Sequence, residues 1–238
     1  MSVSQSANEN SEQFKPAFAR IKVSPRPGPV RYGPLGLRFQ VTSRGSLALD
    51  LNETEEEMGR FAVILQAVGA MNAKGEPPAV GGDGSYSITK IASGAAEFTV
   101  TSERLVFLMN KAESVTGKVD IGRGGVLALV MPIVDVECVS VRRGTSMFGR
   151  VKERQTWIQQ VSTTATIVID GGIAIVEGGR VSSWKAVHSR VAEVIVNAAA
   201  RARLAQEAVN DEERDVLERA LRGERRQEGD ETIAALRP

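Results

Sequence analysis

Apolar residues alternate with polar ones in two short runs, at 37–41 and 47–51, with a glycine-containing segment between them. A period of two places alternate side chains on one face of an extended strand. Two such runs joined by a short segment that contains glycine are typical of a β-hairpin. We therefore expect a hairpin near the start of the folded part of the chain.

The next apolar positions follow a helical spacing. Asn52 has the character of a helix N-cap, and Glu55 stands three residues later, as in a capping box. One helical face then carries Met58, Phe61, Ile64, Leu65, Val68 and Met71. Gly75 and the two prolines after it end the pattern. The spacing predicts a helix over 53–73.

The centre of the chain is a succession of runs rich in Val, Ile, Thr and Phe, with Gly, Asp or Asn at many of the breaks. The runs cover 86–91, 97–109, 126–131, 133–141, 156–161, 166–169 and 173–176. Asp170-Gly171-Gly172 predicts a tight turn between the last two. Since no long helical pattern separates these strands, the sequence favours a curved antiparallel sheet over a parallel one.

A second helical pattern follows the strands and predicts an amphipathic helix over 183–209 that packs on the sheet. Its apolar face carries Trp184, Val187, Val191, Val194, Ile195, Ala198 and Ala202. Residues 210–238 permit one short helix before Gly223, and we expect a solvated, charged tail after it. Residues 1–34 begin with polar residues and turn rich in proline, which predicts a disordered arm.

Two short motifs lie within the strand region. In the first, Val100-Thr101 ends a strand, Ser102-Glu103 follow, and Arg104-Leu105-Val106-Phe107 returns as the next strand. The second is Met131-Pro132-Ile133-Val134-Asp135-Val136. Together with a final strand pair and one long helix, these motifs resemble the GRAM and bacterial PH-like domains over about residues 86–203.

The resemblance implies an α+β, mainly β fold: a curved antiparallel PH-like barrel capped by a long C-terminal helix. An N-terminal β-hairpin plus helix precedes it. The expected organisation is a disordered Pro-rich arm at 1–34, a hairpin–helix unit at 35–80, a PH-like domain at 81–209 and a charged tail at 210–238. The unit at 35–80 either stands apart or supplies the first strands of the barrel.

Composition excludes several classes of protein. The chain has 238 residues, 42% of them hydrophobic, and can bury a core without cross-links. A single cysteine, Cys138, excludes an intramolecular disulfide and a multi-cysteine zinc site, and a single histidine, His188, excludes a histidine-rich metal centre. We expect no cofactor, no membrane-spanning segment and no signal peptide.

Catalytic interpretations rest on isolated residues. His188 lies beside the apolar face of the predicted C-terminal helix, where we expect a structural histidine. Cys138 alternates with Val134 and Val136, which predicts a small core side chain. The glycines at 122–125 lack the third glycine of a dinucleotide-binding fingerprint and favour a hairpin turn. We therefore expect a protein that is not an enzyme.

Residues 142–154 combine basic side chains with an apolar tip. The basic residues are Arg142, Arg143, Arg150, Lys152 and Arg154, and the tip carries Met147 and Phe148. A Lys or Arg near an anionic lipid surface contributes about 1 kcal/mol, and burying a Phe or Met side chain adds roughly 1.5–3 kcal/mol. The segment predicts a ligand or membrane contact. The competing interpretation is an ordinary charged hairpin whose aromatic residue packs back onto the barrel.

These observations lead to two functional hypotheses. The first is a PH-like recruitment module that contacts a protein partner or an anionic membrane surface, located in the cytoplasm or at the inner membrane face. The alternative is an oligomeric protein–protein scaffold without lipid contact, which uses the two predicted helices and the charged tail as interfaces and leaves a homo-oligomer open. A net charge of +1 argues against nucleic acid as the partner.

Overall fold

The structure is a computed structural model that describes residues 17–22, 28–32, 37–41, 47–71, 87–109, 113–114, 117–118, 125–145, 149, 151–160, 165–175 and 187–238. The first strands are β1 (Ala17–Lys22), β2 (Gly28–Tyr32), β3 (Leu37–Val41), β4 (Leu47–Asp50), β5 (Glu57–Met71), β6 (Ser87–Thr101) and β7 (Arg104–Met109). The next are β8 (Glu113–Ser114), β9 (Gly117–Lys118), β10 (Gly125–Pro132), β11 (Val136–Thr145), β12 (Val151–Gln160) and β13 (Ala165–Ile175). The helices α2 (Val187–Leu204) and α3 (Asp211–Leu221) and the strands β14 (Arg226–Glu228) and β15 (Glu231–Ala235) complete the chain.

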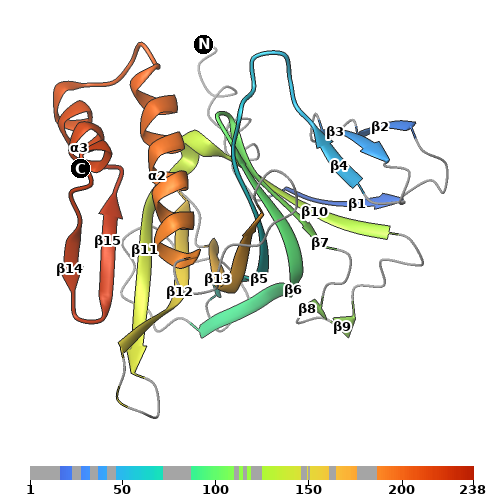
Figure 1. Ribbon diagram of the computed structural model, residues 1–238, viewed down its shortest axis with the longest axis horizontal. Coiled ribbons are helices and arrows are strands. Elements are labelled where there is room, and N and C mark those ends of the chain that lie inside the picture. The colour runs from blue at the N-terminus through green and yellow to red at the C-terminus, as the bar shows by residue number, and fades with distance from the viewer. Residues whose placement is uncertain are drawn as a thin grey trace, which may run out of the picture.

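Antiparallel strands dominate the fold, which is α+β and mainly β (Figure 1). Among the described strands, the large sheet runs in the order β1-β10-β7-β6-β5-β13-β12-β11-β15-β14, and β8 and β9 attach to it at β6. Every pairing in it is antiparallel, as the sequence predicts. Its two described end strands, β1 and β14, do not pair with each other, so the predicted barrel is not closed.

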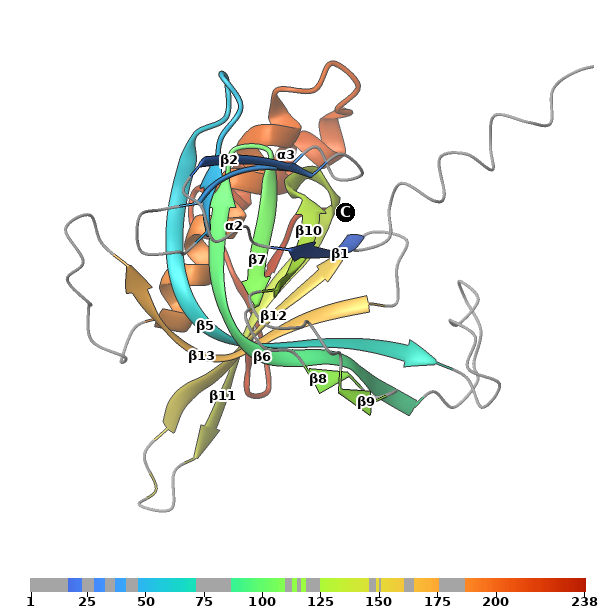
Figure 2. The ribbon, with the colours of Figure 1, turned by 90° about the vertical axis from the view of Figure 1, so that its right-hand side faces the viewer.

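The sheet curls around α2, which lies against its concave face (Figures 1 and 2). Three phenylalanines from successive strands, Phe61, Phe98 and Phe107, are buried under the helix, and the rings of Phe98 and Phe107 stack with their centroids 4.1 Å apart. From α2 the core takes Val187, Val191, Ala192, Ile195, Val196, Ala198, Ala199 and Ala200. The expected amphipathic helix is therefore present over 187–204, and its apolar side packs on the sheet. It ends at Leu204 and not at 209, and residues 183–186, with Trp184 of the predicted apolar face, lie outside the described residues.

The prediction of a helix over 53–73 is wrong. Residues 53–71 form a turn followed by β5, which pairs with β6 and β13. Phe61, Val63 and Leu65 alternate into the core, whereas Ala62 and Ile64 face solvent. Because both faces of this strand carry apolar residues, the set read as a helical face mixes buried and exposed positions. The expected hairpin at 37–51 is confirmed by the pairing of β3 with β4, which join β2 in a separate three-stranded sheet.

Both ends of the chain contain strands that the sequence did not predict. In the expected arm, β1 pairs with β10 and β2 pairs with β3, so a disordered arm is wrong for these two segments. Pro29 is accommodated because β2 is an edge strand, where a missing backbone donor costs no sheet hydrogen bond. In the expected tail, α3 is present, but β14 and β15 form a hairpin on the edge of β11 in place of a solvated segment.

The predicted tight turn at Asp170-Gly171-Gly172 is also absent. Residues 165–175 form one continuous strand whose pairing with β5 shifts register between Ile169 and Gly171. Such a bulge bends a strand, and glycine tolerates it well because it has no side chain to place. The two glycines therefore mark the bend that lets β13 follow the curvature of the sheet.

A buried ion pair anchors the turn before β5 to the β6–β7 hairpin. Arg104 donates from Nε and Nη2 to the two carboxylate oxygens of Glu55, at 2.8 and 2.7 Å, and Thr101 Oγ1 donates to Glu55 Oε1 at 2.6 Å. The Asn52 amide donates to Glu55 Oε2 at 3.1 Å. Burial by itself raises the pKa of Glu55, but these hydrogen bonds outweigh it and hold the pKa below its usual value.

A second buried cation, Arg203, lies elsewhere in the core and bonds to two backbone carbonyl groups. Arg203 of α2 donates from Nε to Val134 O at 2.7 Å and from Nη1 to Leu236 O at 2.5 Å. Burial lowers the pKa of Arg203 to about 10, which still leaves it protonated at neutral pH. The guanidinium thereby ties the helix to the segment that crosses from β10 to β11 and to the end of β15.

Replacing Glu55 with glutamine leaves the guanidinium of Arg104 buried without a carboxylate, and we expect a loss of about 3 kcal/mol in the free energy of unfolding at pH 7. The pKa of Glu55 lies below its unfolded value of 4.5, so its contribution is complete above that pH and is lost as the pH falls through the folded pKa. Urea titrations of wild type and variant should therefore converge at acidic pH. Glu56→Gln, at the exposed neighbour, is the control, and equal losses in the two variants would contradict the assignment.

Candidate functional site

The basic segment singled out in the sequence forms the end of the β11–β12 hairpin. Figures 1 and 2 both show this end projecting past the N-terminal end of α2. Arg143, Lys152 and Arg154 are exposed there, and Arg142 is half-buried. Met147, Phe148 and Arg150, also predicted as contact residues, lie outside the described residues. The structure therefore brings four of the seven predicted contact residues together on one hairpin.

Arg142 lies on the face of the sheet that points away from α2. On the helix side, Val139 and Val141 are buried in the core, so the alternation of β11 directs Arg142 to the opposite face. Its guanidinium carbon lies 3.6 Å from the centroid of the Trp157 ring. Its Nε lies 2.5 Å from Glu231 Oε1 of β15, in an ion pair that is not aligned as a hydrogen bond. Arg142 thus joins three neighbouring strands.

A bulge in the hairpin gathers further polar side chains around Arg142. The pairing of β11 with β12 shifts between Arg142 and Arg143, which pair with Gln155 and Glu153, so Arg154 is the extra residue. A bulge re-aims side chains relative to simple alternation. Arg154 donates from Nη2 to Thr145 O at 3.1 Å and crosses Gly144, where a Cβ would lie only 2.8 Å from Arg154 Nε. Glycine at 144 is therefore what gives Arg154 room.

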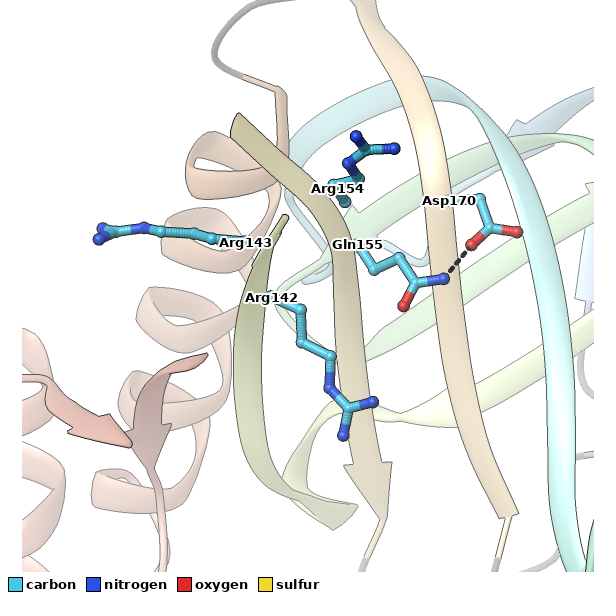
Figure 3. Close-up of a pocket in the computed structure, with 5 residues that line it drawn as sticks. All are labelled: Arg142, Arg143, Arg154, Gln155 and Asp170. Carbon is cyan, nitrogen blue, oxygen red and sulfur yellow. Dashed lines mark hydrogen bonds between the residues drawn. The ribbon is translucent and has the colours of Figure 1, made fainter. Parts of the chain in front are cut away.

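The resulting depression has a volume of about 490 Å³ and is lined by Arg142, Arg143, Arg154, Gln155 and Asp170 (Figure 3). Gln155 Nε2 donates to Asp170 Oδ1 at 2.6 Å, and Gln155 Oε1 accepts from Trp157 Nε1 at 3.0 Å. Arg143 points away from Arg142, to the other side of β11 (Figure 3). The depression is open and mainly basic, and suits a diffuse anionic partner better than an enclosed small molecule.

Four residues of this arrangement were not singled out from the sequence as parts of the site: Gln155, Trp157, Asp170 and Glu231. Trp157 lies in the run predicted as a strand over 156–161, whereas Gln155 precedes that run; both belong to β12, where residues two apart share a face. Their meeting with Arg142 depends on strand register. Glu231 depends on the C-terminal hairpin, which the sequence did not predict.

The single histidine is buried between α2 and the sheet. Its Nδ1 lies 3.0 Å from Thr156 Oγ1 of β12, and both side chains are buried. Burial lowers the pKa of His188, and the nearby Glu153 and Asp170 oppose this only in part. The contact between His188 and Thr156 joins α2 to β12, which is a structural role.

Cys138 is half-buried, which corrects the expectation that it is a core residue. A register shift between Val136 and Cys138 reverses the alternation, so Val139 enters the core and Cys138 faces Gln159, with its Sγ 3.2 Å from Gln159 Oε1. Burial raises the pKa of the thiol to about 11, and the carboxylates of Glu137 and Glu231 add to the effect. The reactive thiolate is therefore scarce at neutral pH.

In the described part of the chain, no three or more His, Cys, Asp or Glu side chains gather in a way that could hold a metal ion. No helix within the described ranges combines the length and apolar character needed to cross a bilayer. Comparison with known proteins gives no matching family model, no matching curated protein and no matching solved structure.

Replacing His188 with glutamine should remove a pH dependence of stability. Because the pKa of the folded state lies below the unfolded value of 6.5, the contribution of His188 is complete above that pH and is lost as the pH falls. One such group changes the free energy of unfolding by up to about 1.4 kcal/mol per pH unit. Thermal melts between pH 7.5 and 5.5 measure this, and His188 is the chain's single histidine. Parallel profiles for wild type and His188→Gln would overturn the prediction.

Proposed function

We propose that this protein is a non-enzymatic, PH-like recruitment module that docks on an anionic membrane surface through the end of the β11–β12 hairpin. The observation that carries the proposal is the placement of Arg143, Lys152 and Arg154, all exposed, on a hairpin that projects beyond the helix (Figure 1). When the hairpin points toward a membrane, these three cations reach the charged surface before the rest of the described fold.

The PH-like assignment draws support from the order of the strands. Leaving aside the short β8 and β9, seven consecutive strands from β5 to β13 lie side by side as β10-β7-β6-β5-β13-β12-β11, and α2 follows them in the chain. An antiparallel sheet that curls around a helix arriving last is the arrangement that the resemblance leads us to expect. The motif Val100-Thr101 to Arg104 coincides with the turn from β6 to β7.

A membrane surface fits the site better than a protein groove does. The cations are spread along a hairpin, and the depression beside them is open and has Asp170 on its wall. A plane of anionic headgroups needs only exposed cations, whereas a specific peptide needs an enclosed and complementary pocket. The near-neutral net charge does not weaken the argument, because charges more than about 8 Å apart are largely screened at physiological ionic strength.

The alternative, an oligomeric scaffold, loses two of its three expected interfaces. The segment 53–73 is a turn and a strand inside the sheet, and α2 is largely buried against the sheet. The third, the charged tail, contributes β14, which lies at the end of the sheet. This strand is short and its three residues are exposed and polar, which is typical of an edge protected against pairing with other chains.

Sedimentation with vesicles tests the proposal. Wild-type protein should pellet with phosphatidylglycerol vesicles and not with phosphatidylcholine vesicles, and the bound fraction should fall as salt rises. The double variant Arg143→Gln/Lys152→Gln should partition about 30-fold more weakly, since each cation contributes about 1 kcal/mol.

The control removes the same charge elsewhere. Arg201 is exposed in the last turn of α2, and Arg214 is exposed on α3. Figure 1 shows the C-terminal end of α2 and the helix α3 at the end of the molecule opposite the hairpin, so Arg201→Gln/Arg214→Gln should pellet like wild type. Equal weakening by the two double variants would mean that net charge alone drives binding. If pelleting of the wild type does not depend on lipid charge, the anionic membrane surface is rejected as the partner and the oligomeric scaffold remains.

A further inference from the structure

Arg142 contacts an acidic side chain from the C-terminal β14–β15 hairpin. Glu231 is the first residue of β15 and pairs with Arg142 in the register of β11 and β15. Its Oε1 lies 2.5 Å from Arg142 Nε, and the two side chains keep 28% and 40% of their surface exposed. A carboxylate therefore holds the position at which a phosphate oxygen of a lipid headgroup would meet this guanidinium.

We propose that Glu231 is an internal competitor for Arg142: it occupies the guanidinium in the free protein and yields it to a lipid phosphate on an anionic surface. The inference rests on the proposed membrane docking and adds a residue and a sequence of events to it. Arg142 then contributes to docking only after the carboxylate of the C-terminal hairpin has been displaced.

The surroundings of Arg142 favour exchange over permanent pairing. Trp157 holds the guanidinium from one side with a ring contact at 3.6 Å, so the group stays in place when its carboxylate partner leaves. The ion pair is partly exposed and lacks hydrogen-bond alignment, and pairs of this kind contribute little to stability. A phosphate can offer the same guanidinium an aligned, bidentate contact, for which arginine is well suited.

The hairpin itself need not unfold for the exchange. Its attachment to β11 runs through backbone pairing from Cys138–Ala235 to Arg142–Glu231, and the buried side chains Ala234 and Leu236 lie at the far end from Glu231. The Arg143 amide also donates to Asp230 O at 2.8 Å. Only the Glu231 side chain has to move away from the guanidinium.

The experiment compares two glutamine variants in the same hairpin. Glu231→Gln removes the competitor, whereas Glu228→Gln removes an equal charge from a residue whose Oε1 lies 2.9 Å from Arg226 Nε in β14. Both variants release one arginine and change the net charge equally, but only Glu231→Gln releases Arg142. We expect Glu231→Gln to partition into phosphatidylglycerol vesicles about fivefold more strongly than Glu228→Gln, the effect of one further cation at the surface.

The same pair of variants in an Arg142→Gln background completes a double-mutant cycle. With Arg142 absent, the Glu231 and Glu228 variants should partition alike. A difference that persists without Arg142 would assign the effect to loosening of the hairpin and overturn the proposal, as would equal partitioning of the two variants when Arg142 is present. Wild-type binding with either of these results would leave membrane docking intact, whereas absence of lipid-dependent binding in every protein, wild type included, would reject both.

Discussion

The packing of α2 against the concave face of one antiparallel sheet is the interaction on which the rest of the structure depends. The buried residues of the helix include small ones, Ala198, Ala199 and Ala200, and larger ones, such as Val191 and Ile195. Small side chains allow the backbones to approach, and burial of the larger ones supplies most of the stabilisation. Because the helix follows the strands β5 to β13 in the chain, its packing joins residues that lie far apart in the sequence.

The two buried cations, Arg203 and Arg104, lie at turns of the chain between strands of the curled sheet. The strands β10 and β11 follow each other in the chain but are not neighbours in the sheet, so the chain has to pass from one to the other. It does so through the turn of 3-10 helix at Ile133–Asp135. Carbonyl groups in such a turn lack sheet partners, and Arg203 supplies donors to Val134 O. The Glu55–Arg104 pair has the same role at the other turn, where the chain enters β5. Each cation satisfies backbone or carboxylate oxygens at a place where the sheet itself cannot.

The sequence predicted the elements whose pattern is local. The period of α2 and the alternation of β3 and β4 were both visible, and the turn between β6 and β7 coincides with a motif. The turn at Asn52 is an element that the local pattern predicted incorrectly. One half of the expected capping box is present, since the Asn52 amide donates to Glu55, but Glu55 also accepts from Arg104, and the chain then continues as a strand. The partners of this segment, Arg104 for Glu55 and the strands β6 and β13 for β5, all lie far along the chain, beyond the reach of a local pattern.

The candidate site divides in the same way. The cluster of basic residues at 142–154 was evident from composition, and its place on a strand hairpin followed from the alternation around it. The bulge that makes Arg154 the extra residue beside Gln155 could not be predicted, because residues 152–155 are all polar and offer no apolar alternation that would fix the register there. The partners Trp157, Asp170 and Glu231 come from register and topology, which the residues of the segment do not encode by themselves.

The C-terminal hairpin explains how a nearly neutral protein can carry a strongly basic end. Residues 142–154 carry five basic side chains and one acidic one, whereas the turn from Glu228 to Glu231 is acidic, and the pairing of β15 with β11 brings the two segments side by side. The opposite charges meet in the partly exposed Arg142–Glu231 pair, and a pair of this kind contributes little to folding. A hairpin that needed the Arg142–Glu231 pair for its attachment would lose its place when an anionic surface competed for Arg142. One held by backbone pairing and by Ala234 and Leu236 does not, and this separation of attachment from charge allows the site to change partners without unfolding.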